Sequence, residues 1–351
     1  MNILITGVAG FIGSNFLKFY REKNKNDLII GVDALTYAGN IINLEKEIEN
    51  GDIIFCKADI RDRDKVEEIF YKHNVEVVVN FAAESHVDRS IHNPQIFLET
   101  NVLGTHTLLE VARKKWCCNG KWDEDKLFLQ ISTDEVYGSL GPQGYFTEET
   151  PLDPHSPYAA SKAAADLIVK SYSDTYGMPV NITRCSNNYG PYQFPEKLIP
   201  LMIWNALNHK ELPIYGDGRQ IRDWLHVRDH CEAIELVIKR GKRGEVYNIG
   251  GNNEWKNIEI VKKLIKILRH KTGDYGIGEH LIKHVPDRLG HDRRYAIDAS
   301  KIRKELGWEP KINFEQGINI TVEWYLQNID WVKSVITGEY LEFYNKNYNK
   351  K

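Results

Sequence analysis

The chain has 351 residues, of which 42% are hydrophobic and 27% are charged, and its formal net charge is −3. This composition is that of a folded protein longer than one typical domain, which argues against wholesale disorder and favours two closely associated lobes. The small net charge gives no reason to expect a nucleic acid or an anionic membrane as the partner.

The first half of the chain alternates short β-branched runs with amphipathic stretches. Such alternation predicts right-handed βαβ units, in which helices cover both faces of a parallel sheet. The expected fold class is therefore α/β, a Rossmann-type doubly wound parallel sheet joined to a smaller mixed α/β lobe. We expect strands at residues 3–5, 28–32, 53–55, 75–81 and 127–132, and helices at 12–21, 64–73, 100–115 and 157–176.

The pattern weakens after Asn187, where loops rich in glycine, proline and aromatic residues follow. Residues 116–126 and 138–157 are expected to be irregular, whereas a helix at 228–240 and a strand at 245–249 should return to the main sheet. The expected division is a Rossmann domain at 1–187 plus about 220–249, a substrate-binding lobe at 188–219 plus about 250–327, and a C-terminal extension at 328–351 that ends in a polar tail at 345–351.

The N-terminus lacks the features of a signal peptide, and no apolar run approaches the ~20 residues that span a bilayer. The five cysteines form no C-x-x-C pair, so we expect reduced thiols in a cytoplasmic protein. His86, His226 and His291 lie on different expected elements without ligand-like spacing, and we therefore expect no metal site.

A glycine-rich turn follows the first expected strand and opens the first helix. Gly7, Gly10 and Gly13 would let the backbone approach a pyrophosphate at the helix N-terminus. Asp33 ends the second strand 20 residues after Gly13, where a carboxylate would accept hydrogen bonds from a ribose. Because no Arg or Lys occurs between Asp33 and Asn43, NAD is favoured over NADP. Asp59 could flank the adenine or could equally be an ordinary cap at a strand end.

Tyr158 and Lys162 are four residues apart on an expected helix, so they project from one face. A nearby ammonium would lower the pKa of the phenol and make it a usable base. Such a pair is common by chance, and its value here comes from its position after a strand that ends in Ser132 and Thr133. The next two residues are the carboxylic acids Asp134 and Glu135, which could divide acid and base roles if only one of them is ionised.

Together these features resemble the extended short-chain dehydrogenases/reductases that act on nucleotide sugars. The run Ser132 to Gly138 (STDEVYG) is similar to the motif of dTDP-glucose 4,6-dehydratases, in which the Asp-Glu pair separates them from the related 4-epimerases. Matches extend from residue 3 to about 326. Further similar stretches are 82–90, 187–192, 194–200, 222–224 and 290–295.

The resemblance implies an NAD-dependent hydro-lyase of deoxysugar (for example rhamnose) biosynthesis, which converts dTDP-glucose to dTDP-4-keto-6-deoxy-glucose and water. C4 is oxidised, water is eliminated across C5 and C6, and hydride returns to C6, so NAD is regenerated in each turnover. Tyr158 would accept the 4-hydroxyl proton, and Lys162 would hold the ribose and tune Tyr158. Thr133 would bind the reacting oxygen, Glu135 would be the base at C5, and Asp134 would be the acid at O6.

The resemblance also implies binding sets and an assembly, a homodimer in which helices 100–115 and 157–176 pair as a four-helix bundle. Leu289 departs from the proline expected in the D-R-P-G-H run. The implied cofactor set is Gly7, Gly10, Phe11, Ile12, Gly13, Asp33, Ala34, Leu35, Thr36, Asp59, Ile60, Phe81, Ala82, Ala83, Ser85, Thr100, Tyr158, Lys162 and Asn188. The implied substrate set is Ser85, Thr133, Asn187, Lys197, Leu198, Pro213, Ile214, Tyr215, Arg222, Asn257, Asp287, Arg288, Leu289, Gly290 and His291.

Three alternatives stay open at this point. A nucleotide-sugar 4-epimerase would share every feature except the Asp134-Glu135 pair. A 4,6-dehydratase for GDP-mannose or CDP-glucose would share the pair, although the GDP-mannose enzyme is expected to favour NADP, which Asp33 argues against. A non-catalytic NAD-sensing regulator on the same fold would have no need of Thr133, Tyr158 and Lys162 together.

Overall fold

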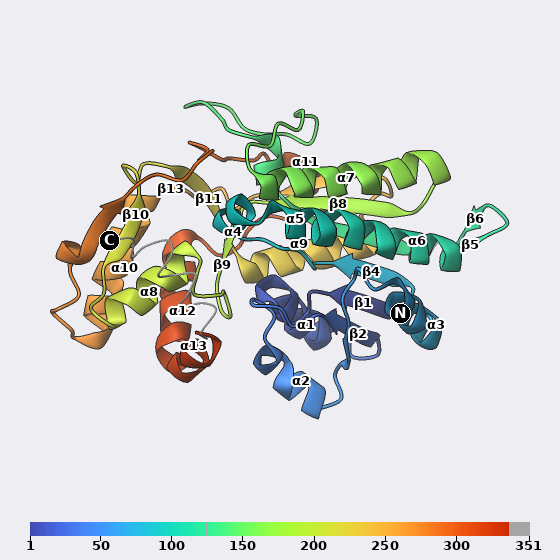
Figure 1. Cartoon of the computed structure of the whole chain (residues 1–351), viewed down its shortest axis with the longest axis horizontal. Helices are drawn as coiled ribbons and strands as arrows, with labels where there is room; N and C mark the ends of the chain where they lie inside the picture. The colour runs from blue at the N-terminus through green and yellow to red at the C-terminus, as the bar shows by residue number, and fades with distance from the viewer. Residues whose placement is uncertain (124, 337–351) are drawn as a thin grey trace.

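Seven parallel strands form the main sheet of the computed structural model, which describes residues 1–123 and 125–336 (Figure 1). Their order across the sheet is β12-β8-β7-β4-β1-β2-β3, so the expected doubly wound parallel sheet is confirmed. The order reverses between β1 and β4, and α/β sheets bind ligands beyond the carboxyl ends of their strands at such a point. The strands are β1 Asn2–Thr6, β2 Leu28–Asp33, β3 Ile54–Lys57, β4 Val77–Asn80, β7 Leu127–Thr133, β8 Val180–Cys185 and β12 Val246–Ile249.

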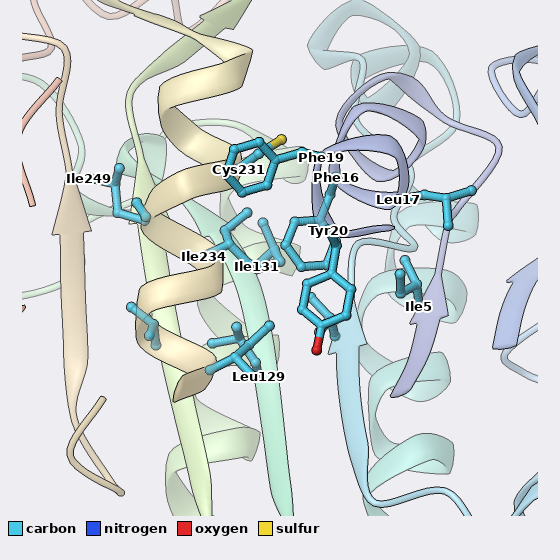
Figure 2. Close-up of a cluster of buried hydrophobic side chains, with 14 of the residues drawn as sticks. Ile5, Phe16, Leu17, Phe19, Tyr20, Leu129, Ile131, Cys231, Ile234 and Ile249 are labelled. Atoms are coloured by element: carbon cyan, nitrogen blue, oxygen red, sulfur yellow. The ribbon is translucent and has the colours of Figure 1, made fainter. Parts of the chain in front are cut away.

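Helices cover both faces of this sheet because successive side chains of each strand point to opposite faces. Ile3 and Ile5 of β1 join a buried cluster with α1 and α9, which Figure 2 shows, whereas Leu4 joins the cluster on the other face. The helices of the first face are α1 Phe11–Lys23, α9 Val227–Arg240 and α11 Ser300–Leu306, and those of the second are α3 Arg63–His73, α6 Thr105–Trp116 and α7 Pro157–Tyr176.

A second lobe lies at one end of the main sheet, at the left of Figure 1, and has its own buried cluster. It contains a parallel pair of strands, a three-stranded sheet of order β13-β11-β9, and four helices. The strands are β9 Asn187–Tyr189, β10 Leu212–Tyr215, β11 Ile221–His226, β13 Glu254–Lys256 and β14 Ile282–Val285, and the helices are α8 Leu198–Leu207, α10 Asn257–Thr272, α12 Phe314–Gln327 and α13 Ile329–Val335.

Two segments of the first half differ from the sequence expectation. The expected loop at 116–126 contains a small hairpin, whose turn residues Asn119 and Gly120 both have positive φ, as an Asn-Gly hairpin turn requires. The expected helix at 100–115 begins instead as a π-helical segment. The elements of these regions are α2 Glu45–Glu49, α4 Val87–His92, α5 Pro94–Phe97, the π-helical segment Leu98–Gly104, β5 Cys117–Cys118 and β6 Lys121–Trp122, and short 3-10 turns lie at Ile41–Leu44, Asp134–Tyr137 and Glu279–Leu281.

The packing also bears on the division into lobes. β11 falls within the span 220–249 assigned to the Rossmann domain, yet it pairs with β9 and β13 outside the main sheet. Conversely, Ile302 and Trp308 lie in the span assigned to the substrate-binding lobe, yet they pack in the core of the first lobe. We therefore propose a two-lobe division in which 221–226 belong to the second lobe and 299–308 to the first. The expected extension begins with α13, and its polar tail at 345–351 lies outside the described residues.

Across residues 1–123 and 125–336, no helix is both long enough and apolar enough to cross a bilayer.

The core makes a direct prediction about stability. Leu129 of β7 has no exposed surface, so Leu129→Ala should lower the free energy of unfolding by about 2–5 kcal/mol through the cavity it leaves. Urea unfolding followed by circular dichroism measures the change. Leu289→Ala is the matched control because that leucine is 75% exposed, and it should shift stability by no more than about 0.5 kcal/mol. Equal effects of the two substitutions would contradict this placement of Leu129.

Candidate active site

Two adjoining cavities lie beyond the carboxyl ends of the strands, and we call them the first and second compartments. The first has a volume of about 320 Å³ and the second about 160 Å³. Both are lined by Glu135, Asn187, Asn188, Gln193, Glu196 and Lys197, so they form two parts of one cleft. The first is bordered mainly by the Rossmann lobe and the second mainly by the second lobe.

The glycine-rich turn forms one wall of the first compartment. Gly7 has φ +63°, and a Cβ atom at this position would lie 2.7 Å from the backbone nitrogen of Ala82. A Cβ atom at Gly13 would lie 2.3 Å from the carbonyl oxygen of Gly7. Gly10 precedes α1 and provides no side-chain cap, so N–H groups of its first turn are left for an anion such as a pyrophosphate.

Asp33 lies at the end of β2, where its two carboxylate oxygens are fixed by backbone donors. The Ala9 N–H donates to Oδ2 at 2.9 Å and the Leu35 N–H donates to Oδ1 at 2.8 Å. Burial raises the pKa of Asp33, and these two hydrogen bonds oppose the rise. The loop from β2 is thereby held in one conformation beside the first compartment.

The structure places every residue of the expected cofactor set on the wall of the first compartment, except Leu35. Leu35 has φ +55° and its side chain packs against the core of the Rossmann lobe. Leu35 contributes its backbone N–H, which donates to Asp33. A sequence motif marks the position but does not show whether the backbone or the side chain makes the contact. Asp59 accepts the Arg61 N–H at 2.8 Å, as a cap at a strand end would, and it also lines the compartment, so contact with the adenine stays a prediction.

Thr133, Asp134 and Glu135 occupy the junction between β7 and a single 3-10 turn. Thr133 ends the strand and caps the turn, because its Oγ1 accepts the Glu135 N–H at 3.3 Å. The Thr133 hydroxyl also lies 3.3 Å from Oδ1 of Asp134. Asp134 is 1% exposed and lines neither compartment, whereas Glu135 lines both. The Oδ2 atom of Asp134 has no partner among the residues described.

The two adjacent carboxyl groups are in different electrostatic environments. Burial raises the pKa of Asp134 well above its usual range, and the charge of Glu135 adds to the effect. Burial also raises the pKa of Glu135, but Arg222, Lys197 and Arg288 oppose the rise. Asp134 is therefore the more readily protonated group and Glu135 the more readily ionised one, which is the asymmetry that an acid-base pair requires.

Tyr158 and Lys162 come from the first turns of α7. Ser156 caps this helix by accepting the Ala159 N–H at 3.1 Å, and both functional side chains are buried. Nζ of Lys162 donates to the carbonyl of Ile131 at 2.7 Å. Burial, followed by the charge of Glu135, raises the pKa of Tyr158 well above its usual range, while a hydrogen bond with Thr133 opposes the rise. Burial dominates at Tyr158, so its pKa is raised in the structure, in contrast to the lowering expected from Lys162.

Three cationic side chains border the second compartment. Arg222 donates to the carbonyls of Ile221 and Asp292 at 2.8 and 2.9 Å, and Nζ of Lys197 donates to the carbonyl of Ser85 at 2.7 Å. With Arg288 they form a positive wall that suits a diphosphate.

Most of the expected substrate set lines one of the compartments, with two exceptions. Leu289 points to solvent and lines neither. Asp287 also lines neither, and one of its oxygens lies 2.6 Å from Nδ1 of His291 while the other accepts from Gln220 at 3.1 Å. Asp287 therefore orients His291 from outside the cleft.

Several residues of the cleft received no role from the sequence. Glu196 lines both compartments, and Tyr295 and Trp224 line the second. Glu196 and Tyr295 fall inside stretches that match the family, so the motif itself was the available signal. Trp224 also falls inside such a stretch, 222–224, but a tryptophan in a buried strand is usually a packing residue, so no binding role was expected for it.

Comparison with known proteins agrees with this geometry. The family described as GDP-mannose 4,6 dehydratase matches residues 4–321. A dTDP-glucose 4,6-dehydratase of Xanthomonas campestris pv. campestris (strain B100) is 54% identical over 340 residues, which are 96% of each chain. Among solved structures, a dTDP-glucose 4,6-dehydratase of Bacillus anthracis in complex with NAD has a TM-score of 0.85 and 50% identity over 95% of this chain and 99% of that one. The enzyme of the same name from Streptomyces venezuelae with NAD and TYD bound has a TM-score of 0.88 and 44% identity over 95% and 100%.

The glycine turn gives a prediction about cofactor binding. Gly13→Ala should weaken dinucleotide binding by at least ~10-fold, about 1.4 kcal/mol, because the added methyl group forces the turn open. Calorimetric titration with NAD, together with the dinucleotide content of the purified protein, measures the effect. Gly141→Ala is the matched control, since a Cβ atom there meets nothing within 4 Å. Equal affinity in the two variants would show that the turn does not hold the cofactor.

Proposed function

This chain belongs to the GDP-mannose 4,6 dehydratase family, and we propose that it is a dTDP-glucose 4,6-dehydratase, an NAD-dependent hydro-lyase. It converts dTDP-glucose to dTDP-4-keto-6-deoxy-glucose and water. The observation that carries this proposal is the pair of unequal carboxyl groups: Glu135 lines both compartments, and Asp134 is enclosed directly behind it in the same 3-10 turn. An epimerase has no step that requires such a pair.

The residues of the first compartment fit NAD. The glycine turn packs so closely beside α1 that side chains would not fit at Gly7 and Gly13. Asp33 presents a fixed carboxylate, which would repel the 2′-phosphate of NADP. When bound, NAD supplies the acceptor for the hydride of C4, the donor that returns it to C6, and a positively charged ring in its oxidised form. Positive charge in this compartment would favour the phenolate of Tyr158 and so oppose the effect of burial.

In the first step Tyr158 accepts the proton of the 4-hydroxyl, and Thr133 holds the same oxygen. The ketone at C4 makes the C5 proton acidic. Glu135 then takes that proton while Asp134 gives its own to the leaving 6-hydroxyl, and water departs. Glu135 returns its proton to C5 when C6 is reduced. The proton that Tyr158 gained balances the one that Asp134 lost, so a single transfer to Asp134 restores the site.

The preference for dTDP over GDP rests on two observations. The curated relatives at about half identity are named dTDP-glucose 4,6-dehydratases, and Asp33 favours NAD, whereas the GDP-mannose enzyme is expected to favour NADP. Arg222, Lys197 and Arg288 would hold the diphosphate in the second compartment. We assign the product to the biosynthesis of deoxysugars such as rhamnose.

We also propose a cytoplasmic homodimer. Leu103 of the π-helical segment and Leu167 of α7 are both 57% exposed, and leucines this exposed on adjoining helices suit pairing with a second copy. The four-helix bundle implied by the sequence resemblance would cover them. The cytoplasmic location rests on five cysteines that form no disulfide.

The proposed reaction is tested with two substrates. Incubation with dTDP-glucose should give a keto-sugar nucleotide lighter by one water, detected by mass spectrometry, whereas UDP-glucose should react more slowly. The thymine methyl group is worth only ~1–3 kcal/mol, so the difference in kcat/KM is expected to be about 10- to 200-fold. Inversion at C4 without loss of water would instead establish an epimerase.

The separation of oxidation from elimination is a second prediction. Asp134→Asn combined with Glu135→Gln should still reduce bound NAD, visible at 340 nm, while water loss falls by at least ~100-fold. Tyr158→Phe is the matched contrast, because it should slow the appearance of NADH itself. If the double variant loses water at the normal rate, the roles assigned to Asp134 and Glu135 are wrong.

A further inference from the structure

Asp88 lies in the first turn of α4 and receives three hydrogen bonds from the second lobe. Arg288 donates through Nε to Oδ1 at 2.5 Å and through Nη2 to Oδ2 at 3.0 Å. The hydroxyl of Tyr215 donates to Oδ2 at 3.0 Å. Asp88 is only 6% exposed. Three donors on one buried carboxylate fix the positions of both donor side chains.

The two donors line the second compartment, whereas Asp88 lines neither compartment. Arg288 follows β14 and Tyr215 ends β10, the two strands that pair within the second lobe. The guanidinium of Arg288 also lies 5.1 Å over the Tyr215 ring. Asp88 therefore acts on the wall of the compartment from behind, and it does so across the boundary between the lobes.

The chemistry of the guanidinium shows what this contact achieves. An arginine presents its donors along a rigid planar fork, and a carboxylate that takes the Nε and Nη2 donors sets the orientation of the whole plane. Arginine otherwise has many rotamers, and ordering it when an anion arrives would weaken binding. A carboxylate behind the wall orders the side chain before the anion enters.

We propose that Asp88 is a positioning residue for the nucleotide diphosphate, holding Arg288 and Tyr215 in the orientation that binds it. This inference rests on the proposed function, because the diphosphate is that of the nucleotide sugar. Asp88 does not touch the reacting atoms. Its effect is therefore on the binding of nucleotides, with or without a sugar, and not on the chemical steps.

The test uses Asp88→Asn in the full chain with its NAD, and dTDP as the probe. Calorimetry should show dTDP binding weakened by ~10-fold or more, and KM for dTDP-glucose should rise by a similar factor. At saturating substrate, kcat should stay within about threefold, because the bound nucleotide holds Arg288 once it is in place. A residue needed only for folding would instead lower kcat, NAD content and thermal stability together.

Two further variants make the test decisive. Asp217→Asn is the matched control, because Asp217 pairs with Arg293 on the surface at 2.9 Å and both are about half exposed. It should leave dTDP affinity unchanged within about twofold. Arg288→Met removes the partner, so adding Asp88→Asn to it should cost little further affinity if Asp88 acts mainly through Arg288.

The possible outcomes separate the two proposals. Unchanged or tighter dTDP binding in Asp88→Asn, or fully additive losses in the double variant, would overturn the role of Asp88 while the unaltered protein still dehydrates dTDP-glucose. An unaltered protein that binds dTDP but forms no keto-sugar would overturn the proposed function alone, because the affinities still report on Asp88. Failure of the unaltered protein to bind dTDP would overturn both. If Asp88→Asn does not fold, Asp88→Glu replaces it, and a loss of affinity without loss of kcat is again expected.

Discussion

Two carboxyl groups that are adjacent in the chain cannot both be ionised in a poorly solvated cleft without large repulsion, and the function of this protein depends on how that repulsion is resolved. Asp134 is enclosed beside the Thr133 hydroxyl, and the charges of Glu135 and Asp223 oppose its ionisation, whereas Glu135 reaches the cleft and lies in the field of three cations. One group is therefore kept as an acid and the other as a base. The single 3-10 turn after β7 produces this difference, because it directs consecutive side chains to different surroundings.

The cations that favour the ionised form of Glu135 belong to the second lobe, so the chemistry depends on how the two lobes are joined. The segment from Ser85 to Arg89 makes three of these connections. Ser85 accepts from Lys197, Asp88 from Arg288, and Arg89 pairs with Glu196 at 3.1 Å. Because these contacts border the cleft, the field of the cations reaches Glu135 mainly through protein and less through water. The cations therefore stabilise the ionised form of Glu135 more strongly than they would at a surface.

The sequence predicted the parts of this account that follow from local periodicity and from motifs. Six of the seven strands of the main sheet were predictable from their apolar runs, because a parallel sheet buries both faces of each strand, and the helix at 157–176 was predictable from its periodicity. The strand β8 at Val180–Cys185 was not expected. The Asn119-Gly120 dipeptide is typical of a hairpin turn and was sufficient to predict this hairpin. The π-helical start of the helix near residue 100 and the outward side chain of Leu289 depend on tertiary packing, which no local pattern reports. The contact between Asp88 and Arg288 joins residues 200 positions apart, so only the folded chain reveals it.

The central claim is that one hydrogen moves from C4 to C6 of the same sugar while the protein's carboxyl groups remove water between the two transfers. The most direct measurement follows the fate of deuterium in dTDP-[4-²H]glucose, with the product analysed by mass spectrometry and NMR. The account predicts a 4-keto product that has lost one water and carries the deuterium on its C6 methyl group. Deuterium that remains at C4 of an inverted sugar, or that is released into free NADH, would contradict it.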